Sequence, residues 1–177
     1  MRNLTTQLTQ YAEYHRDPRN ILTHFIGVPM IVLAVVILLS RPVLLSLVQG
    51  ELPITPAVLV VLAVCVFYGL LDLRYCVAMA LVLAVMLAIG QWCAQQSTGF
   101  WIAAGVGLFV VGWVIQFIGH YYEGRKPAFV DDVIGLAIGP LFVLAEMGFS
   151  LGLRREVQHA IEERAGPVRR RESGAVS

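Results

Sequence analysis

All four histidines of the chain, His15, His24, His120 and His159, lie at the ends of apolar stretches, and none lies inside one. Imidazole is the commonest protein ligand for transition metals. Because a bilayer excludes ionisable groups from its hydrocarbon interior, histidines gathered at one rim can share a site there. The alternative is that each ring is solvated, or bonds a backbone carbonyl, at the membrane interface. Whether the histidines share a metal site or are solvated separately depends on the helices that carry them.

The composition is that of an integral membrane protein. The chain is 58% hydrophobic and only 14% charged, with a mean hydropathy of +0.73, whereas a soluble domain is about 25% charged. About 20 apolar residues are needed to cross a hydrocarbon core of about 30 Å. Four stretches meet that length, at residues 21–39, 54–71, 76–94 and 100–119. We therefore expect an all-α membrane helical bundle with four transmembrane helices, and the net charge of +1 gives no indication of a nucleic-acid partner.

A fifth apolar stretch, residues 133–153, contains Gly139-Pro140 and the carboxylate Glu146. Proline inside a helix removes a hydrogen bond and kinks or breaks it. The stretch is therefore expected to be a broken re-entrant or interfacial segment, or a kinked fifth span. Glu146 should face the bundle interior or water.

The positions of the basic residues distinguish a four-span from a five-span topology, because lysine and arginine concentrate on the cytoplasmic side of a membrane protein. Four spans place every lysine and arginine except Arg41 on one face, whereas five spans divide them almost evenly. The four-span topology predicts that both termini are cytoplasmic and that all four histidines lie on that same face.

The remaining organisation is a single membrane-embedded domain, residues 1–165. Residues 41–55 are expected to form an external loop, 154–165 a charged interfacial helix and 166–177 a disordered basic tail. The polar N-terminus has no apolar core of a signal peptide, so no cleavable signal is expected. The three cysteines, Cys65, Cys76 and Cys93, form no CxxC pair and are interpreted as packing residues.

The first polar cluster follows the dipeptide Asp17-Pro18, which favours a helix start. In that helix Asn20 and His24 are one turn apart on one face. The turn before Pro18 can fold His15 back toward His24.

The second cluster is a stripe at the end of the fourth span, Gln116, His120 and Glu123. An unpaired amide in an apolar helix is costly, so Gln116 needs a partner. We expect Asn20 and Gln116 to orient the histidines, with Glu123 supporting them or acting as an alternative ligand. Glu123 could instead form a surface ion pair with Arg125 or Lys126, and His159 can approach from the interfacial helix.

These residues fall into long motifs that resemble a known family. The motifs are Tyr14-His15-x4-Asn20-x3-His24-x2-Gly27-x-Pro29, then Trp113-x2-Gln116-Phe117-x-Gly119-His120-x2-Glu123-x-Arg125-x-Pro127-Ala128, and finally His159. Together they are similar to the small membrane family typified by the fungal 2-hydroxy fatty acid dioxygenase of α-oxidation, over about residues 8–160. One departure is Asp131-Asp132, where the family pattern has Asp-Asn.

The resemblance implies an Fe(II)-dependent membrane enzyme of lipid metabolism that uses O₂ to shorten a 2-hydroxy fatty acid by one carbon. Carried over to matching positions, the metal ligands are His15, His24, His120 and His159. Arg125 and Lys126 are placed to attract the substrate carboxylate. The location implied is the bacterial inner membrane, or the endoplasmic reticulum in a eukaryote.

The residues alone leave other functions open. One is a structural or assembly membrane protein whose polar rim only links helices. Another is a metal-dependent membrane lipid hydrolase, because imidazole suits zinc as well as iron. A transporter is disfavoured by the lack of charges at mid-depth, and a desaturase by the absence of HxxHH-type clusters. Oligomeric state and substrate chain length do not follow from the sequence.

Overall fold

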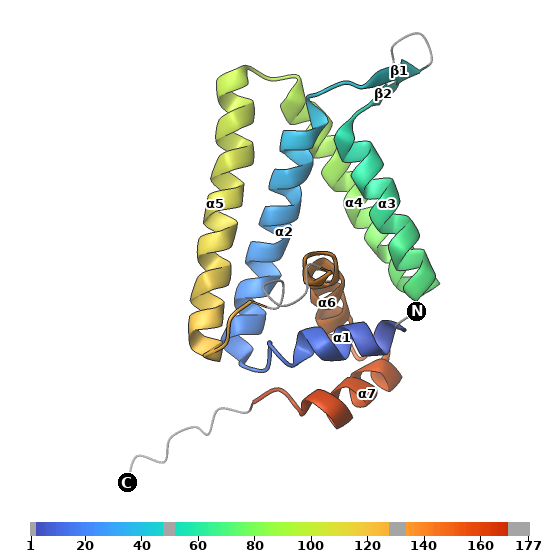
Figure 1. Ribbon diagram of the computed structural model, residues 1–177, viewed down its shortest axis with the longest axis vertical. Helices are drawn as coiled ribbons and strands as arrows, with labels where there is room; N and C mark the ends of the chain where they lie inside the picture. Colours follow the sequence, from blue (N-terminus) through green and yellow to red (C-terminus); the bar gives the residue numbers. More distant parts are fainter. Residues whose placement is uncertain (1–2, 48–51, 128–133, 170–177) are drawn as a thin grey trace. The chain divides into compact units, whose positions relative to one another are not determined.

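The computed structural model describes residues 3–47, 52–127 and 134–169. Asp131-Asp132 and residues 170–177 of the expected tail lie outside that range. The described part is helical apart from one small hairpin, which confirms the predicted all-α class (Figure 1). Its elements are α1 (Leu4–Ala12), α2 (Pro18–Ser40), β1 (Leu45–Leu47), β2 (Leu52–Ile54), α3 (Pro56–Leu71), α4 (Leu73–Ala94), α5 (Thr98–Glu123), α6 (Gly135–Ser150) and α7 (Arg155–Ala165). Strands β1 and β2 pair antiparallel within the predicted loop 41–55.

Three of the described helices, α2, α4 and α5, are long and apolar enough to cross a membrane. The predicted span 54–71 is helical but shorter than expected. Its helix α3 begins only at Pro56, with the Thr55 side chain capping the first turn, and has 16 residues. At 1.5 Å per residue this gives about 24 Å, less than a hydrocarbon core.

The fifth apolar stretch is broken, but not at its proline. Helix α6 continues through Pro140, and the chain turns by 113° between α6 and α7. Pro140 is the sixth residue of α6, so its missing N–H leaves the Leu136 carbonyl in the first turn without its bond within the helix. The break comes at Gly152, which has φ 76°, where the Leu153 N–H donates to the Gly148 carbonyl at 2.9 Å. A glycine with positive φ and this back-bond form a Schellman helix end.

The chain forms two compact units, which we call the first unit (residues Met1–Phe25 and Gln116–Ser177) and the second unit (Ile26–Ile115). Helices α2 and α5 contribute to both. In the second unit α3 packs on α4 (Figure 1). Glycines bring other helices close: a Cβ at Gly90 of α4 would lie 2.9 Å from Val36 of α2. Small residues allow such close approach of membrane helices.

In the first unit α1 packs against α6 and α7 (Figure 1). Helix α1 buries Leu4, Leu8 and Ala12, which recur every four residues and so share one face. Helix α7 buries Val157 and Ile161 in the same way. This packing leaves the last turn of α1 and the loop after it beside the start of α2.

Candidate metal centre

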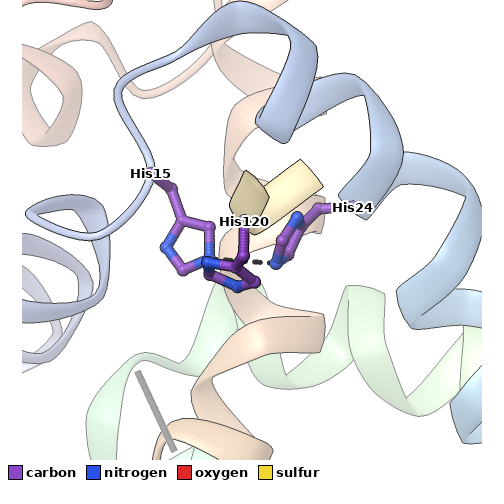
Figure 2. A group of neighbouring side chains, drawn as sticks. All are labelled: His15, His24 and His120. Carbon is purple, nitrogen blue, oxygen red and sulfur yellow. Dashed lines mark hydrogen bonds between the residues drawn. The ribbon is translucent and has the colours of Figure 1, made fainter. Parts of the chain in front are cut away.

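Three of the four histidines converge in the first unit (Figure 2). His15 lies in the loop between α1 and α2, His24 in α2, and His120 in the last turn of α5. Each offers one ring nitrogen, and these three atoms all lie within 4.8 Å of one another. The residues are 0%, 1% and 6% exposed, in that order. The prediction that histidines distant in sequence meet is therefore confirmed for these three.

The hydrogen bonds of His15 and His24 fix which nitrogen faces the cluster. His15 Nδ1 donates to the Tyr11 carbonyl at 2.7 Å, and His24 Nδ1 donates to the Asn20 carbonyl at 2.8 Å. A carbonyl only accepts, so each neutral ring carries its lone pair on Nε2. The two Nε2 atoms lie 2.9 Å apart. Two facing lone pairs are stable at that distance only when they share a cation, either a proton or a metal ion.

The donor set fits a metal ion. With metal–nitrogen bonds of about 2.1 Å, neighbouring ligands lie about 3.0 Å apart at right angles and about 3.4 Å apart in a tetrahedron. The 2.9 Å between the two Nε2 atoms matches the right-angled arrangement. His120 Nδ1 is buried and has no hydrogen-bond partner among the described residues. Burial, and next the adjacent His24 ring, hold the pKa of His15 well below its ordinary value, so this ring stays neutral and can donate its lone pair.

Aromatic rings fix the His15 side chain in place. Tyr11 stacks on it with ring centroids 4.2 Å apart and planes 3° apart, and Phe142 of α6 lies at 5.6 Å. The helix start predicted at Asp17-Pro18 is confirmed, because α2 begins at Pro18 and Asp17 Oδ1 accepts the Arg19 N–H at 2.8 Å. The loop that carries His15 is thus held from both sides.

The Glu123 carboxylate holds this loop to the end of α5, and we call its hydrogen bonds to the loop and to Asn20 the Glu123 bracket. Its Oε2 accepts the backbone N–H of Arg16 at 3.0 Å, the N–H of Asp17 at 2.8 Å and the Asn20 amide at 3.1 Å. Three donors on one buried oxygen tie the end of α5 to the turn before α2. Glu123 is not a surface residue: its carboxylate is buried, and its other oxygen, Oε1, lies 3.5 Å from Arg169 Nη2.

Asn20 contacts both the backbone before α2 and the His24 ring. Its amide also donates to the Tyr14 carbonyl at 3.2 Å, and its own carbonyl accepts the His24 Nδ1–H. Gln116 is buried as well, yet its Nε2 has no hydrogen-bond partner in the described part of the chain. The contact to a histidine expected of Gln116 is thus not among the hydrogen bonds described.

His159 does not join the other histidines. It is exposed on α7, whose buried residues Val157 and Ile161 lie on either side of it in sequence and on the opposite helix face. The two basic residues expected to attract substrate, Arg125 and Lys126, are exposed beyond the end of α5. Arg125 Nη1 donates to the Glu13 carbonyl at 2.8 Å.

Arg16 is the structural residue that the sequence did not single out. Its guanidinium is buried and donates to the carbonyls of Ala12, His15 and Gly166, each at 2.9 Å. Its Nη2 lies 3.7 Å from Glu146 Oε1, so the carboxylate in α6 faces the interior as predicted. An arginine beside an apolar stretch is normally a topology signal, and only the unexplained Glu146 hinted at a buried partner.

Comparison with known proteins shows the family. The family described as "2-hydroxy-palmitic acid dioxygenase Mpo1-like" matches over residues 1–151. The chain belongs to the Mpo1-like family. The match includes all three clustered histidines and ends before α7, which carries His159. The resemblance found from the motifs is therefore confirmed.

A curated Mpo1-like relative covers nearly the same length. The "2-hydroxy-palmitic acid dioxygenase MPO1" of Saccharomyces cerevisiae is 33% identical over 167 residues, which is 90% of this chain and 90% of the yeast protein. No solved structure matches the chain.

Proposed function

We propose that this chain is an Fe(II)-dependent dioxygenase of fatty acid α-oxidation, which converts a 2-hydroxy fatty acid and O₂ to a fatty acid one carbon shorter. The observation that carries the proposal is the convergence of three buried imidazoles in a chain of the Mpo1-like family. The named activity of the yeast relative supports the substrate class.

His15, His24 and His120 would hold the iron. Non-haem iron oxygenases keep coordination positions open for substrate and O₂, and bound iron would supply the redox chemistry that O₂ needs. Three neutral imidazoles leave the charge of a divalent ion uncompensated, which favours an anionic, chelating ligand such as a 2-hydroxy carboxylate.

The other side chains of the site position and shield the histidines. Glu123 and Asn20 hold the loop of His15 and the start of α2 in register with His120. The Tyr11 and Phe142 rings cover His15 and keep water from that side of the cluster. Arg125 and Lys126 would attract the carboxylate head group, while the hydrocarbon tail stays in the bilayer.

The overall reaction balances without a further reductant. The bond between C1 and C2 breaks, C1 leaves as CO₂, C2 becomes the new carboxyl carbon, and water is released. The two carbons together give up four electrons, which is what complete reduction of O₂ requires. No second cofactor is therefore needed.

The apolar helices α2, α4 and α5 indicate a membrane enzyme. The distribution of lysine and arginine supports both termini on the cytoplasmic side, in the bacterial inner membrane or the endoplasmic reticulum.

The proposal is tested by turnover of the detergent-purified protein, reconstituted with Fe(II) under argon. On admission of ¹⁸O₂, 2-hydroxypalmitate should give pentadecanoic acid carrying ¹⁸O, whereas palmitate should give none. An iron-loaded protein that leaves 2-hydroxypalmitate unchanged would contradict the proposal. Zinc rather than iron in the native protein, with hydrolysis of a lipid ester, would point to the hydrolase instead.

A further inference from the structure

The amide of Gln116 is a buried hydrogen-bond donor without an acceptor. The residue is 4% exposed, and its Nε2 has no partner among the described residues. Leaving such a group unpaired destabilises the folded state. A leucine or methionine at this position would avoid that penalty, so the amide needs an explanation outside the folded chain itself.

Helix register places Gln116 at the level of the histidines. On α5, Gln116 and His120 are one turn apart and both buried, while Phe117 and Tyr121 beside them are exposed. Gly119 of α5 faces α2 closely, because an added Cβ there would lie 2.5 Å from Asn20 Oδ1.

The two helices run antiparallel, since Gly112 faces Gly27 whereas Gly119 faces Asn20. One turn back along α5 from His120 is Gln116, and one turn forward along α2 from Asn20 is His24. Gln116 and His24 therefore lie at the same level of the first unit.

The other buried side chains with nitrogen donors beside the histidines each have a charged or polar partner, although Arg16 Nη2 has only the Glu146 carboxylate at 3.7 Å and no hydrogen bond. Arg16 donates to three carbonyls and pairs with Glu146 at 3.7 Å, and the Asn20 amide is shared between Tyr14 and Glu123. His120 Nδ1 is unpaired too, but its ring belongs to the group that would hold the metal. Gln116 is thus the amide donor left free at this level of the described structure.

We propose that Gln116 is a substrate-binding residue, whose Nε2 donates a hydrogen bond to an acceptor oxygen in the polar head of the bound 2-hydroxy acid. This rests on the proposed function. The carboxylate and the 2-hydroxyl both offer acceptor oxygens, and a buried hydrogen bond to one of them discriminates strongly against ligands that lack it.

The proposal predicts opposite signs for stability and binding. Gln116→Met has nearly the same volume and removes the unpaired donor. Without ligand it should melt about 2–4 °C above wild type, as relief of one such penalty implies for a chain of this size. Its affinity for 2-hydroxypalmitate under argon should fall by about 10- to 100-fold. Gln7→Met, which alters another buried glutamine of the first unit, is the control and should leave the affinity unchanged.

Equilibrium binding of radiolabelled 2-hydroxypalmitate and palmitate to the iron-loaded proteins identifies the acceptor. Equal losses for both ligands assign the carboxylate, and a loss confined to 2-hydroxypalmitate assigns the hydroxyl; either supports the proposal. Gln116→Glu, which places a negative charge there, should bind both ligands more weakly than Gln116→Met.

Wild-type affinity in Gln116→Met would overturn the role of Gln116. If the melting temperature of that variant also fell, the amide would bond the protein or a buried water instead. Iron content and wild-type turnover are measured in the same preparations. Failure of the proposed function then shows as absent turnover in wild type, whereas failure here shows as an active wild type with an unaffected variant.

Discussion

The two units of the chain share the same long helices, α2 and α5, but bury different chemistry. All but two of the buried polar side chains described lie in the first unit. The exceptions, Ser40 and Thr55, only make local hydrogen bonds to the backbone of their own helices. The second unit therefore packs mainly through apolar helices and close glycine contacts, with a few side-chain hydrogen bonds such as that from Trp101 Nε1 to the Ile37 carbonyl at 2.8 Å. The polar cluster is not what membrane helices need in order to pack.

The polar cluster also carries a cost, because most of the buried side-chain atoms without a hydrogen-bond partner in the described residues lie in the first unit. The buried atoms along it that have no hydrogen-bond partner in the described residues include Asn20 Oδ1, Gln116 Nε2 and His120 Nδ1. Each such atom destabilises the fold by about 1–3 kcal/mol. Under the proposed function, the first unit is built around a ligand, whereas the second unit serves the stability of the fold. Substitutions that separate these two effects test that difference.

The largest effect is expected for the clustered histidines. His120→Ala should reduce turnover of 2-hydroxypalmitate by more than the about 10- to 100-fold that loss of a supporting residue costs, because a metal-holding ring is gone. Helical content by circular dichroism should stay at the wild-type level, since the second unit does not depend on it. His159→Ala is the matched control and should remain active, because His159 is exposed on α7. Wild-type turnover in His120→Ala would refute the site.

Removal of the Glu123 bracket should affect both stability and the site. Glu123→Ala leaves three N–H donors without their acceptor, so the free energy of unfolding should fall by about 3 kcal/mol. Metal affinity should fall by about 10- to 100-fold, because the loop of His15 is released. Metal titration and denaturant melts measure the two effects.

Glu163→Ala, which removes an exposed carboxylate from α7, is the control for Glu123→Ala. Unchanged metal affinity in Glu123→Ala, despite lower stability, would mean that the bracket only joins helices.

A pair of glycine substitutions compares the units directly. Gly119→Ala brings a methyl group against Thr23 and to 2.5 Å from Asn20 Oδ1, and Gly90→Ala brings one to 2.7 Å from Ser40 Oγ. Each should destabilise the protein by about 1–3 kcal/mol through overpacking. Only Gly119→Ala should also weaken metal binding, because it displaces the Asn20 side chain.

Gly107→Ala, where nothing lies within 4 Å, completes the glycine series. It should be neutral or stabilising by up to about 1 kcal/mol, because alanine is the better helix former. If Gly90→Ala lowered metal affinity as much as Gly119→Ala, the division between a ligand-binding and a stabilising unit would be wrong.

The smallest effect is expected for Arg125. Arg125→Gln removes an exposed charge that is held by the Glu13 carbonyl. Since exposed charges act mainly by attraction over distance, kcat/KM should fall only about two- to fivefold at low salt, with kcat unchanged. The difference from wild type should vanish at about 1 M salt, where screening is nearly complete. A persistent loss there would indicate direct contact with substrate.

Much of this structure was accessible from the sequence, because its signals are local. The lengths of α2, α4 and α5 follow from apolar composition, and the start of α2 from Asp17-Pro18. The shared face of Asn20 and His24, and that of Gln116, His120 and Glu123, follow from helical periodicity. The motifs around the histidines indicated the family. Pro140 was expected to kink or break the fifth apolar stretch, whereas α6 continues through it and the chain turns at Gly152.

What the sequence did not provide are contacts between residues far apart in the chain. The Glu123 bracket spans more than a hundred residues, and Arg16 meets the carbonyl of Gly166. No local pattern encodes such pairs. His159 was grouped with the other histidines by membrane face and by the family resemblance, and only the packing of α7 through Val157 and Ile161 shows that it points away.

The most direct test of the account is the iron content per chain of protein purified without chelator and reconstituted with Fe(II) under argon. Wild type and His159→Ala should each hold about one iron per chain, while His15→Ala, His24→Ala and His120→Ala should hold almost none. Loss of iron from His159→Ala, or full iron in any of the other three, would contradict a centre built from His15, His24 and His120.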